Sequence, residues 1–197
     1  MLRPSNFVEA AMKSRAILSD VPPASAINAQ LPNANFYDCY GISVPDADTN
    51  HIALAYFLKA MGNSPAWTNS LMVLRNKVVR LFGLKDLGGF GGLNLSKHAS
   101  DYAPGDRVGI FTLISNSPHE ALLGDSDKHL DVVLSVFKHS PTTDGYVTIS
   151  VTTVVHVHNF LGRIYMLPVK PLHKLIAPAV ISRISGNPKE AAVEAKL

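Results

Sequence analysis

Two histidines stand two positions apart where a β-branched run ends. His156 and His158 close the segment VTTVVHVH, and neutral imidazole is a common ligand of zinc and related ions. His129 and Asp131 repeat this spacing and could extend such a ligand set. A site on strands would still need a further ligand on a neighbouring strand, and no Glu follows His158 at short range. We therefore predict no metal site and no cofactor.

The same residue types could instead act as acids and bases. Histidine titrates close to neutral pH, and a carboxylate that orients its ring can make it a general base. His129 with Asp131 is the candidate catalytic pair, and Glu120 with a histidine is an alternative. The competing interpretation is that histidines at strand ends only hydrogen-bond to backbone or water.

A second polar group follows the histidine pair within an apolar segment. Its Arg, Tyr, Lys and His side chains could bind an anionic head group at the mouth of a cavity. They could equally form a solvated helix face whose long side chains cover apolar surface. The candidate ligand-binding residues are therefore Glu120, His156, His158, Arg163, Tyr165, Lys170 and His173.

Alternation along 146–158 separates polar from apolar side chains. Val and Ile occupy most odd positions, and most even positions carry Thr, Ser or His, so the two groups point to opposite faces of a strand. The apolar face should meet the core or the last helix, while the polar face is solvated or lines a wet surface. If the preceding turn pairs residues whose numbers sum to about 284, His129 and Asp131 lie on the face opposite His156, which a one-residue slip would change.

Hydrophobic periodicity and turn residues predict the elements that carry these side chains. A helix pair separates the first strand from four consecutive strands, and a long helix ends the chain. The predicted helices span 5–18, about 50–61, 65–82 and about 160–185, and the predicted strands span 35–44, 107–116, 120–127, 129–139 and 146–158.

The final helix contains unusual punctuation. Asn159 should cap it, and Gly162 should permit a close helix–sheet approach or a turn. Pro168, Pro171 and Pro178 should kink or segment it, because each proline removes a backbone donor.

Four glycines between residues 88 and 92 could cradle a phosphate. No strand leads directly into them, and no Lys-Ser or Lys-Thr opens a helix after them. A flexible loop is therefore the simpler interpretation.

Segregated strands and helices indicate an α+β fold with an antiparallel meander sheet. The simplest packing wraps the sheet on the long C-terminal helix, which is the helix-grip arrangement and often leaves a cavity between them. We predict one helix-grip domain over 35–185, preceded by a helix and linker over 1–34 and followed by a flexible tail over 186–197.

Composition limits the function classes. The chain is 47% hydrophobic and 17% charged, with a net charge of +3, which leaves room for a cavity or an apolar partner surface. Its basic residues are scattered, so we predict no nucleic-acid partner. Cys39 is the single cysteine and fits a reducing cytoplasm. There is no signal-peptide pattern and no run of about 18 apolar residues, so we predict no transmembrane span.

Three segments carry a resemblance to a known family. PAWTNSLMVLRNKVVRLFGLK, GDSDKHLDVVLSV and TTVVHVHNFLGRIYMLPVKPLHKLI are similar to the bacterial domain-of-unknown-function family 2867, over about residues 35–185. In that family HLDFR stands where this chain has HLDVV, and a basic residue stands at the Phe160 position. A charged role at Val133 or Phe160 is therefore not carried over.

The resemblance has further implications. Some family members follow an NAD(P)-binding domain, which this chain lacks, so reductase activity is not implied. The family in turn resembles the Bet v 1 and polyketide-cyclase (START-like) superfamily. That superfamily implies the same helix-grip fold, a ligand that is mostly apolar, and enzymatic activity in a minority of members.

Three functions remain open. The first is binding of a small apolar or amphipathic molecule between the sheet and the last helix, which a packed core with no cavity above about 300 Å³ would overturn. The second is a cyclase, dehydratase or isomerase that uses a pocket His/Asp pair. The third is a protein-interaction module, related to dehydrogenase-associated domains, whose apolar patch a homodimer would cover.

Overall fold

The structure is a computed structural model that describes residues 15–45, 51–68, 70, 93 and 96–186. Four predictions lie wholly or mainly outside these residues. For the helix predicted over 5–18, the part up to residue 14 lies outside them, and for the helix predicted over 65–82 most of the part after residue 68 does. The glycine-rich loop and the tail from residue 187 lie outside them as well.

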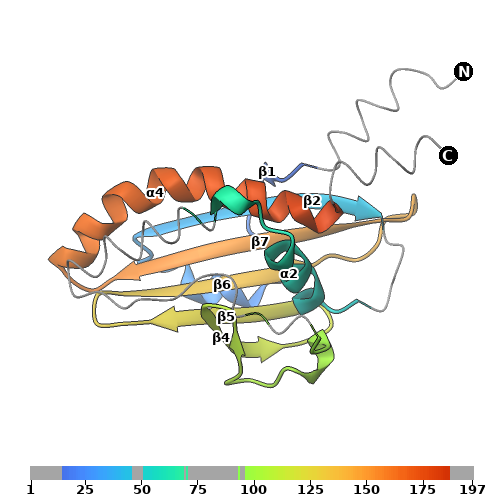
Figure 1. Cartoon of the computed structure of the whole chain (residues 1–197), viewed down its shortest axis with the longest axis horizontal. Helices are drawn as coiled ribbons and strands as arrows, with labels where there is room; N and C mark the ends of the chain where they lie inside the picture. Colours follow the sequence, from blue (N-terminus) through green and yellow to red (C-terminus); the bar gives the residue numbers. More distant parts are fainter. Residues whose placement is uncertain (1–14, 46–50, 69, 71–92, 94–95, 187–197) are drawn as a thin grey trace, which may run out of the picture.

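A seven-stranded antiparallel sheet forms the centre of the molecule, in the order β1-β2-β7-β6-β5-β4-β3. The sheet and the long helix after its last strand confirm the predicted α+β fold with a meander (Figure 1). The strands are β1 (Ile17–Leu18), β2 (Phe36–Pro45), β3 (Arg107–Val108), β4 (Phe111–Asn116), β5 (Glu120–Ser126), β6 (Leu130–Lys138) and β7 (Tyr146–Val157).

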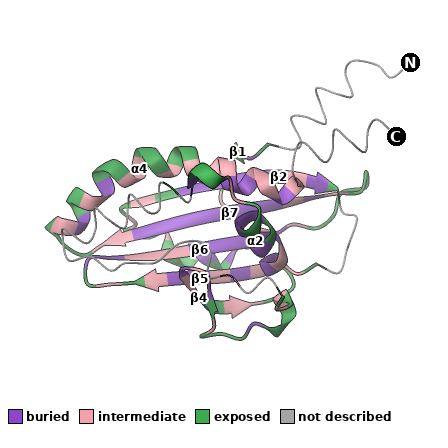
Figure 2. Cartoon of the chain, viewed as in Figure 1, coloured by how far each residue is buried: buried purple, intermediate pink, exposed green. Residues whose placement is uncertain are grey.

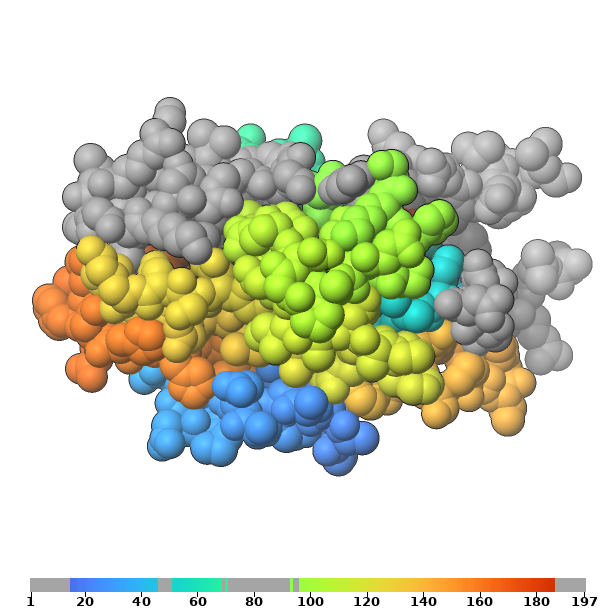
Figure 3. All heavy atoms as spheres, turned by 90° about the horizontal axis from the view of Figure 1, so that it is seen from below, coloured from blue at the N-terminus to red at the C-terminus, as the bar shows by residue number. Residues whose placement is uncertain are grey.

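Helices lie on both faces of this sheet. The two longer ones, α2 (Ala53–Gly62) and α4 (Phe160–Ile181), contact each other and the same face of the strands. The 3₁₀ helix η1 (Ala26–Gln30) contacts β6 and β7 from the opposite face. There are two more 3₁₀ turns in the described residues. The turn η3 (Ala99–Asp101) precedes β3, and the turn η4 (Ser182–Ser185) extends α4. Figure 3, seen from below, shows the blue N-terminal segment along one side of the yellow strands.

Strand alternation produces two differently covered faces. Val147 and Ile149 of β7 are fully buried, and their neighbours Val151 and Val155 lie under α4, as the apolar pattern predicts (Figure 2). The polar face of β7 differs from expectation, because Ser150 and Thr152 are also buried. The N-terminal segment with η1 packs over β6 and β7 on that side, so much of the face is neither solvated nor a wet surface.

The register between β6 and β7 corrects one prediction. Paired residue numbers sum to 287, so Asp131 lies directly across from His156 and shares its face. The hairpin loop is longer than the prediction assumed. Its inner turn is closed where the Thr142 N–H donates to the Tyr146 carbonyl at 2.7 Å, and Gly145 supplies a positive φ of 76°. An odd shift in register moves a strand's side chains to the other face.

Two element boundaries were also wrong. Ile17 and Leu18 are not the end of a helix, because they pair with Gly41 and Tyr40 at the sheet edge. The single strand predicted over 107–116 is a hairpin of β3 and β4. Gly109 adopts a φ of 62° between them, which allows the chain to reverse there.

Helix α4 begins as predicted. The Asn159 side chain accepts from Gly162 N at 3.1 Å and so caps the first turn. A Cβ atom on Gly162 would lie 2.5 Å from the backbone oxygen of His129, so only glycine permits this close approach to the sheet.

The prolines of α4 do not segment it, because a single helix contains all three. Pro168 and Pro171 are exposed and Pro178 is half-buried. On the outer face of a helix, carbonyls that lose a backbone donor can bond to water, so the helix continues. Figure 1 shows the resulting helix bowed over the sheet.

Candidate functional site

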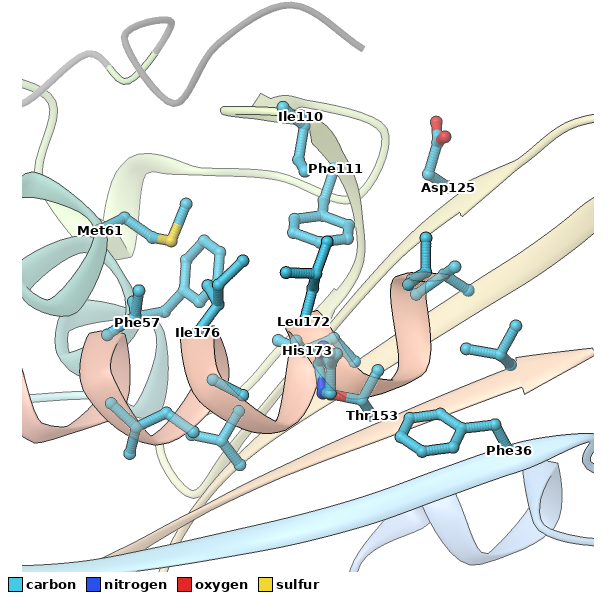
Figure 4. Close-up of a pocket in the computed structure, with 18 of the residues that line it drawn as sticks. Phe36, Phe57, Met61, Ile110, Phe111, Asp125, Thr153, Leu172, His173 and Ile176 are labelled. Atoms are coloured by element: carbon cyan, nitrogen blue, oxygen red, sulfur yellow. The ribbon is translucent and has the colours of Figure 1, made fainter. Parts of the chain in front are cut away.

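An apolar pocket lies between the sheet and α4. Its volume is about 270 Å³, slightly below the lower end of about 300 Å³ for typical ligand pockets. It is incompletely enclosed, so a ligand can extend beyond it. Its walls come from α4, from the facing strands, from the end of α2 and from the β3–β4 turn (Figure 4). Residues that define its extent are Phe36, Met61, Phe111, Leu134, Met166 and Ile176.

One polar pair interrupts this apolar wall. His173 of α4 lines the pocket, and its Nε2 donates to Asp38 Oδ1 of β2 at 3.1 Å. The Asp38 side chain is 7% exposed and that of His173 is 25% exposed. Asp38 Oδ2 is buried without a hydrogen-bond partner among the described residues. Burying a carboxylate oxygen without a partner costs free energy. The hydrogen bond from His173 to the other oxygen is therefore the main contact that stabilises the Asp38 carboxylate.

Neighbouring groups position the imidazole ring. Thr153 lies directly across from Asp38 in the β2–β7 register and also lines the pocket, and Figure 4 shows it beside His173. Phe36 meets the His173 ring edge to face, with centroids 5.5 Å apart. Lys170 lies over the Phe36 ring, with Nζ 5.8 Å from its centroid, and donates to the Asn35 carbonyl at 3.3 Å.

The charge of Asp38 also acts on Tyr40, two residues along the same strand. Burial raises the pKa of the Tyr40 hydroxyl, and the negative charge of Asp38 raises it further. Tyr40 is buried in the core and does not line the pocket. It therefore stays protonated at neutral pH and is no candidate for an activated phenolate.

Two further carboxylates stand at the pocket's β5 end. Asp127 Oδ1 accepts from the backbone N–H groups of His129 and Leu130, so it holds the β5–β6 turn. Asp125 Oδ1 lies 3.7 Å from the Arg107 guanidinium. Both residues line the pocket but have structural partners, and a ligand would compete with these for them.

The predicted ligand-binding residues of α4 divide between the two sides of the helix. Tyr165 and His173 line the pocket. Lys170 is half-buried beside Phe36, whereas Arg163 is exposed. The cluster is therefore neither a single head-group site nor simply a solvated face.

The predicted catalytic pair does not come together. His129 Nδ1 donates to Asn159 Oδ1 at 3.1 Å, and its Nε2 is buried without a partner among the described residues. Asp131 Oδ2 accepts instead from His158 Nε2 at 2.9 Å, and Asp131 also pairs with Ser126. Neither His129 nor Asp131 lines the pocket under α4.

His156 and His158 lie on the opposite side of the sheet from this pocket. His156 Nε2 donates to the Gln30 carbonyl at 2.9 Å and holds the end of η1. With Asp131, it lines an open groove of about 490 Å³ whose other polar walls include Arg107 and Asp125. In the part of the chain that the structure describes, no group of three or more His, Cys, Asp or Glu side chains could hold a metal ion.

Glu120 lies on this second face as well. Its carboxylate accepts from the hydroxyls of Ser25 and Ser135, the latter at 2.6 Å, and from Ala26 N at 2.9 Å. Ala26 opens η1, so the carboxylate caps the positive end of that 3₁₀ turn. These contacts assign Glu120 a structural part in fixing the N-terminal segment.

Asp38 was missed by the sequence interpretation, although a signal existed. In β2 the residues at even positions run Phe36, Asp38, Tyr40, Ile42 and Val44. An aspartate in an otherwise apolar strand face needs a partner in the core. That partner, His173, is 135 residues away in the sequence, so no local pattern could identify it.

Comparison with known proteins gives a family and no function. The model of the family described as "Protein of unknown function (DUF2867)" matches residues 30–180. No curated protein and no solved structure matches significantly.

Proposed function

The chain belongs to the DUF2867 family, whose description assigns no activity, and we propose that it binds a small amphipathic molecule between its sheet and α4. The main support for this proposal is an apolar pocket whose wall contains His173, a histidine that Asp38 orients. Ligand pockets combine apolar walls with a few fixed polar groups in this way.

The chemistry of the wall defines the ligand class. Asp38 engages Nε2 of His173, so Nδ1 is the ring nitrogen left to meet a polar group of the ligand. The aromatic and aliphatic side chains around it favour an apolar body. A volume of about 270 Å³ restricts the enclosed part to a small group. The order of elements also resembles the helix-grip arrangement of the Bet v 1 superfamily, which supports the same ligand class.

Paired substitutions on α4 test this proposal. Ala177 lines the pocket, whereas Ala179, two residues on, does not, and both are half-buried. Titration with 1-anilinonaphthalene-8-sulfonate, an amphipathic fluorophore with an aromatic body and an anionic sulfonate, should show Ala177→Phe binding at least about tenfold more weakly. Losing the burial of one small apolar group weakens binding by about that factor. Ala179→Phe should bind like the wild type. Equal affinity in all three proteins would place the fluorophore elsewhere and refute the proposal.

A second function rests on one specific observation, the carboxylate that holds a pocket histidine. In this arrangement His173 could accept a proton at Nδ1 from a carbon next to a ligand carbonyl and return it, as isomerases and dehydratases require. Incubation of small apolar ketones in heavy water, followed by NMR, measures such exchange directly. Wild-type exchange that disappears in His173→Gln and persists in His129→Gln would support this activity. Exchange that is no faster than in buffer would exclude it for those ketones.

A further inference from the structure

The outer face of α4 carries a continuous apolar stripe. Its members follow one another at spacings of four, three, four and four residues, which places them along one side of a helix. Phe160 and Leu167 are each 74% exposed and Leu175 is 65% exposed. Figure 2 shows this side of α4 largely in the colour of exposed residues. The stripe consists of Phe160, Ile164, Leu167, Pro171 and Leu175.

A basic edge runs beside the stripe. Arg163, Lys170 and Lys174 lie at spacings of seven and four residues, so they share one flank of the helix. Arg163 and Lys174 are exposed, whereas Lys170 is half-buried beside Phe36. No Asp or Glu occurs between Asp144 and Glu190, a segment that contains all of α4. The exposed side of this helix therefore combines apolar side chains with positive charge alone.

We propose that this outer face docks α4 flat onto an anionic lipid surface. Amphipathic helices bind such surfaces by burying apolar side chains at the head-group boundary while Lys and Arg meet anionic lipid. The residues Phe160–Ser185 are long and apolar enough to span a membrane by length and composition alone. Their inner side, however, packs on the sheet and around the pocket through Met166, His173 and Val180, so peripheral docking uses the fold as it stands.

Charge favours a lipid surface over a second copy of the chain. A two-fold symmetric dimer brings the same surface of both subunits together. On this face it would bring together two helices that each carry basic residues and no acidic partner. An anionic bilayer supplies the missing negative charge. Docking through this outer face does not depend on what the pocket binds.

Co-sedimentation of the full chain with vesicles provides the test. One set of vesicles contains phosphatidylcholine only, and the other contains equal parts of phosphatidylcholine and phosphatidylserine. We expect binding to the second set, lost at high salt because screening weakens charge contacts. Lys174→Gln should reduce partitioning roughly fivefold, as expected for one basic residue near the surface. Leu167→Ser and Leu175→Ser should each reduce it by about tenfold.

Matched controls separate docking from general stickiness. Lys128→Gln removes an exposed charge from the β5–β6 turn, and Ile17→Ser removes an exposed apolar side chain from the sheet edge. Both should bind vesicles like the wild type. Absence of binding to the anionic vesicles would overturn the proposal, as would binding that the α4 variants leave unchanged. A dimer in light scattering that Leu167→Ser converts to monomer would also overturn it, in favour of a second copy.

Discussion

His173 Nε2 lies 3.1 Å from Asp38 Oδ1, and this contact joins the middle of the last helix to the first long strand. The two residues are 135 positions apart, and the strand face around Asp38 is otherwise apolar. The contact is therefore both a structural tie across the core and the polar feature of the pocket. Its energetics and its chemistry can be separated by substitution.

Replacing the histidine should cost stability through the carboxylate it leaves behind. In His173→Leu both oxygens of Asp38 are buried without a protein partner, so we expect a loss of about 1–3 kcal/mol in the free energy of unfolding. The double variant Asp38→Asn/His173→Leu should regain part of this loss, because the buried charge is gone. Urea unfolding of the three proteins measures both effects. A double variant less stable than His173→Leu would contradict this account.

Acidification should destabilise the protein through His139. This half-buried ring, whose Nε2 lies 2.9 Å from Ser150 Oγ, has a pKa lowered by burial. In the unfolded chain histidine takes up its proton near pH 6.5, so between that pH and the lower folded pKa the unfolded state binds more protons. The contribution of His139 to the free energy of unfolding is therefore fully present above about pH 6.5. It is lost as the pH falls through the folded pKa.

The variant His139→Gln isolates this contribution. Urea unfolding at about pH 7.5 and about pH 5.5 should show a smaller loss of stability in His139→Gln than in the wild type. The exposed His119 provides the control, and His119→Gln should keep the wild-type pH dependence. If His139→Gln and the wild type lose the same stability, the residue makes no such contribution.

Most elements of the fold could be predicted because their signals are local. Alternating side chains identified β2 and β7, and apolar runs between turn residues identified β5 and β6, each within a residue or two, while Asn159 marked the start of α4. The two-residue strand Ile17–Leu18 could not be predicted in this way, because it exists only by pairing with the free edge of β2. The β6–β7 register failed for a similar reason, since the geometry of the loop sets it.

The candidate site was less accessible to sequence reasoning. His173 was identified by its residue type, but its partner Asp38 is joined to it only by the packing of α4 on β2. His129 and Asp131 seemed paired because they are two residues apart, yet separate contacts with Asn159 and His158 engage them. Proximity in the chain is thus a poor guide to a site assembled from distant elements.

A methyl group at the helix–sheet contact should be poorly tolerated. In Gly162→Ala the new Cβ would lie 2.5 Å from the His129 backbone oxygen and 2.9 Å from Val157, and a backbone atom cannot swing away. We expect a loss of about 1–3 kcal/mol in the free energy of unfolding, as for other overpacked sites. Gly41→Ala is the control, because its Cβ would meet the Ser19 side chain at 3.2 Å, and that side chain can rotate. Similar losses in both variants would contradict the steric explanation.

Glu120 should prove structural, and one substitution distinguishes this from ligand binding. In Glu120→Gln one oxygen becomes a donor, although Ser25, Ser135 and Ala26 N already point donors at the carboxylate. The mismatch should lower the free energy of unfolding by about 1–3 kcal/mol, while fluorophore affinity in the pocket stays unchanged because Glu120 lies on the other face. The exposed Asp101→Asn, on η3, should change neither quantity. A variant with normal stability and weakened fluorophore binding would restore Glu120 as a ligand-binding residue.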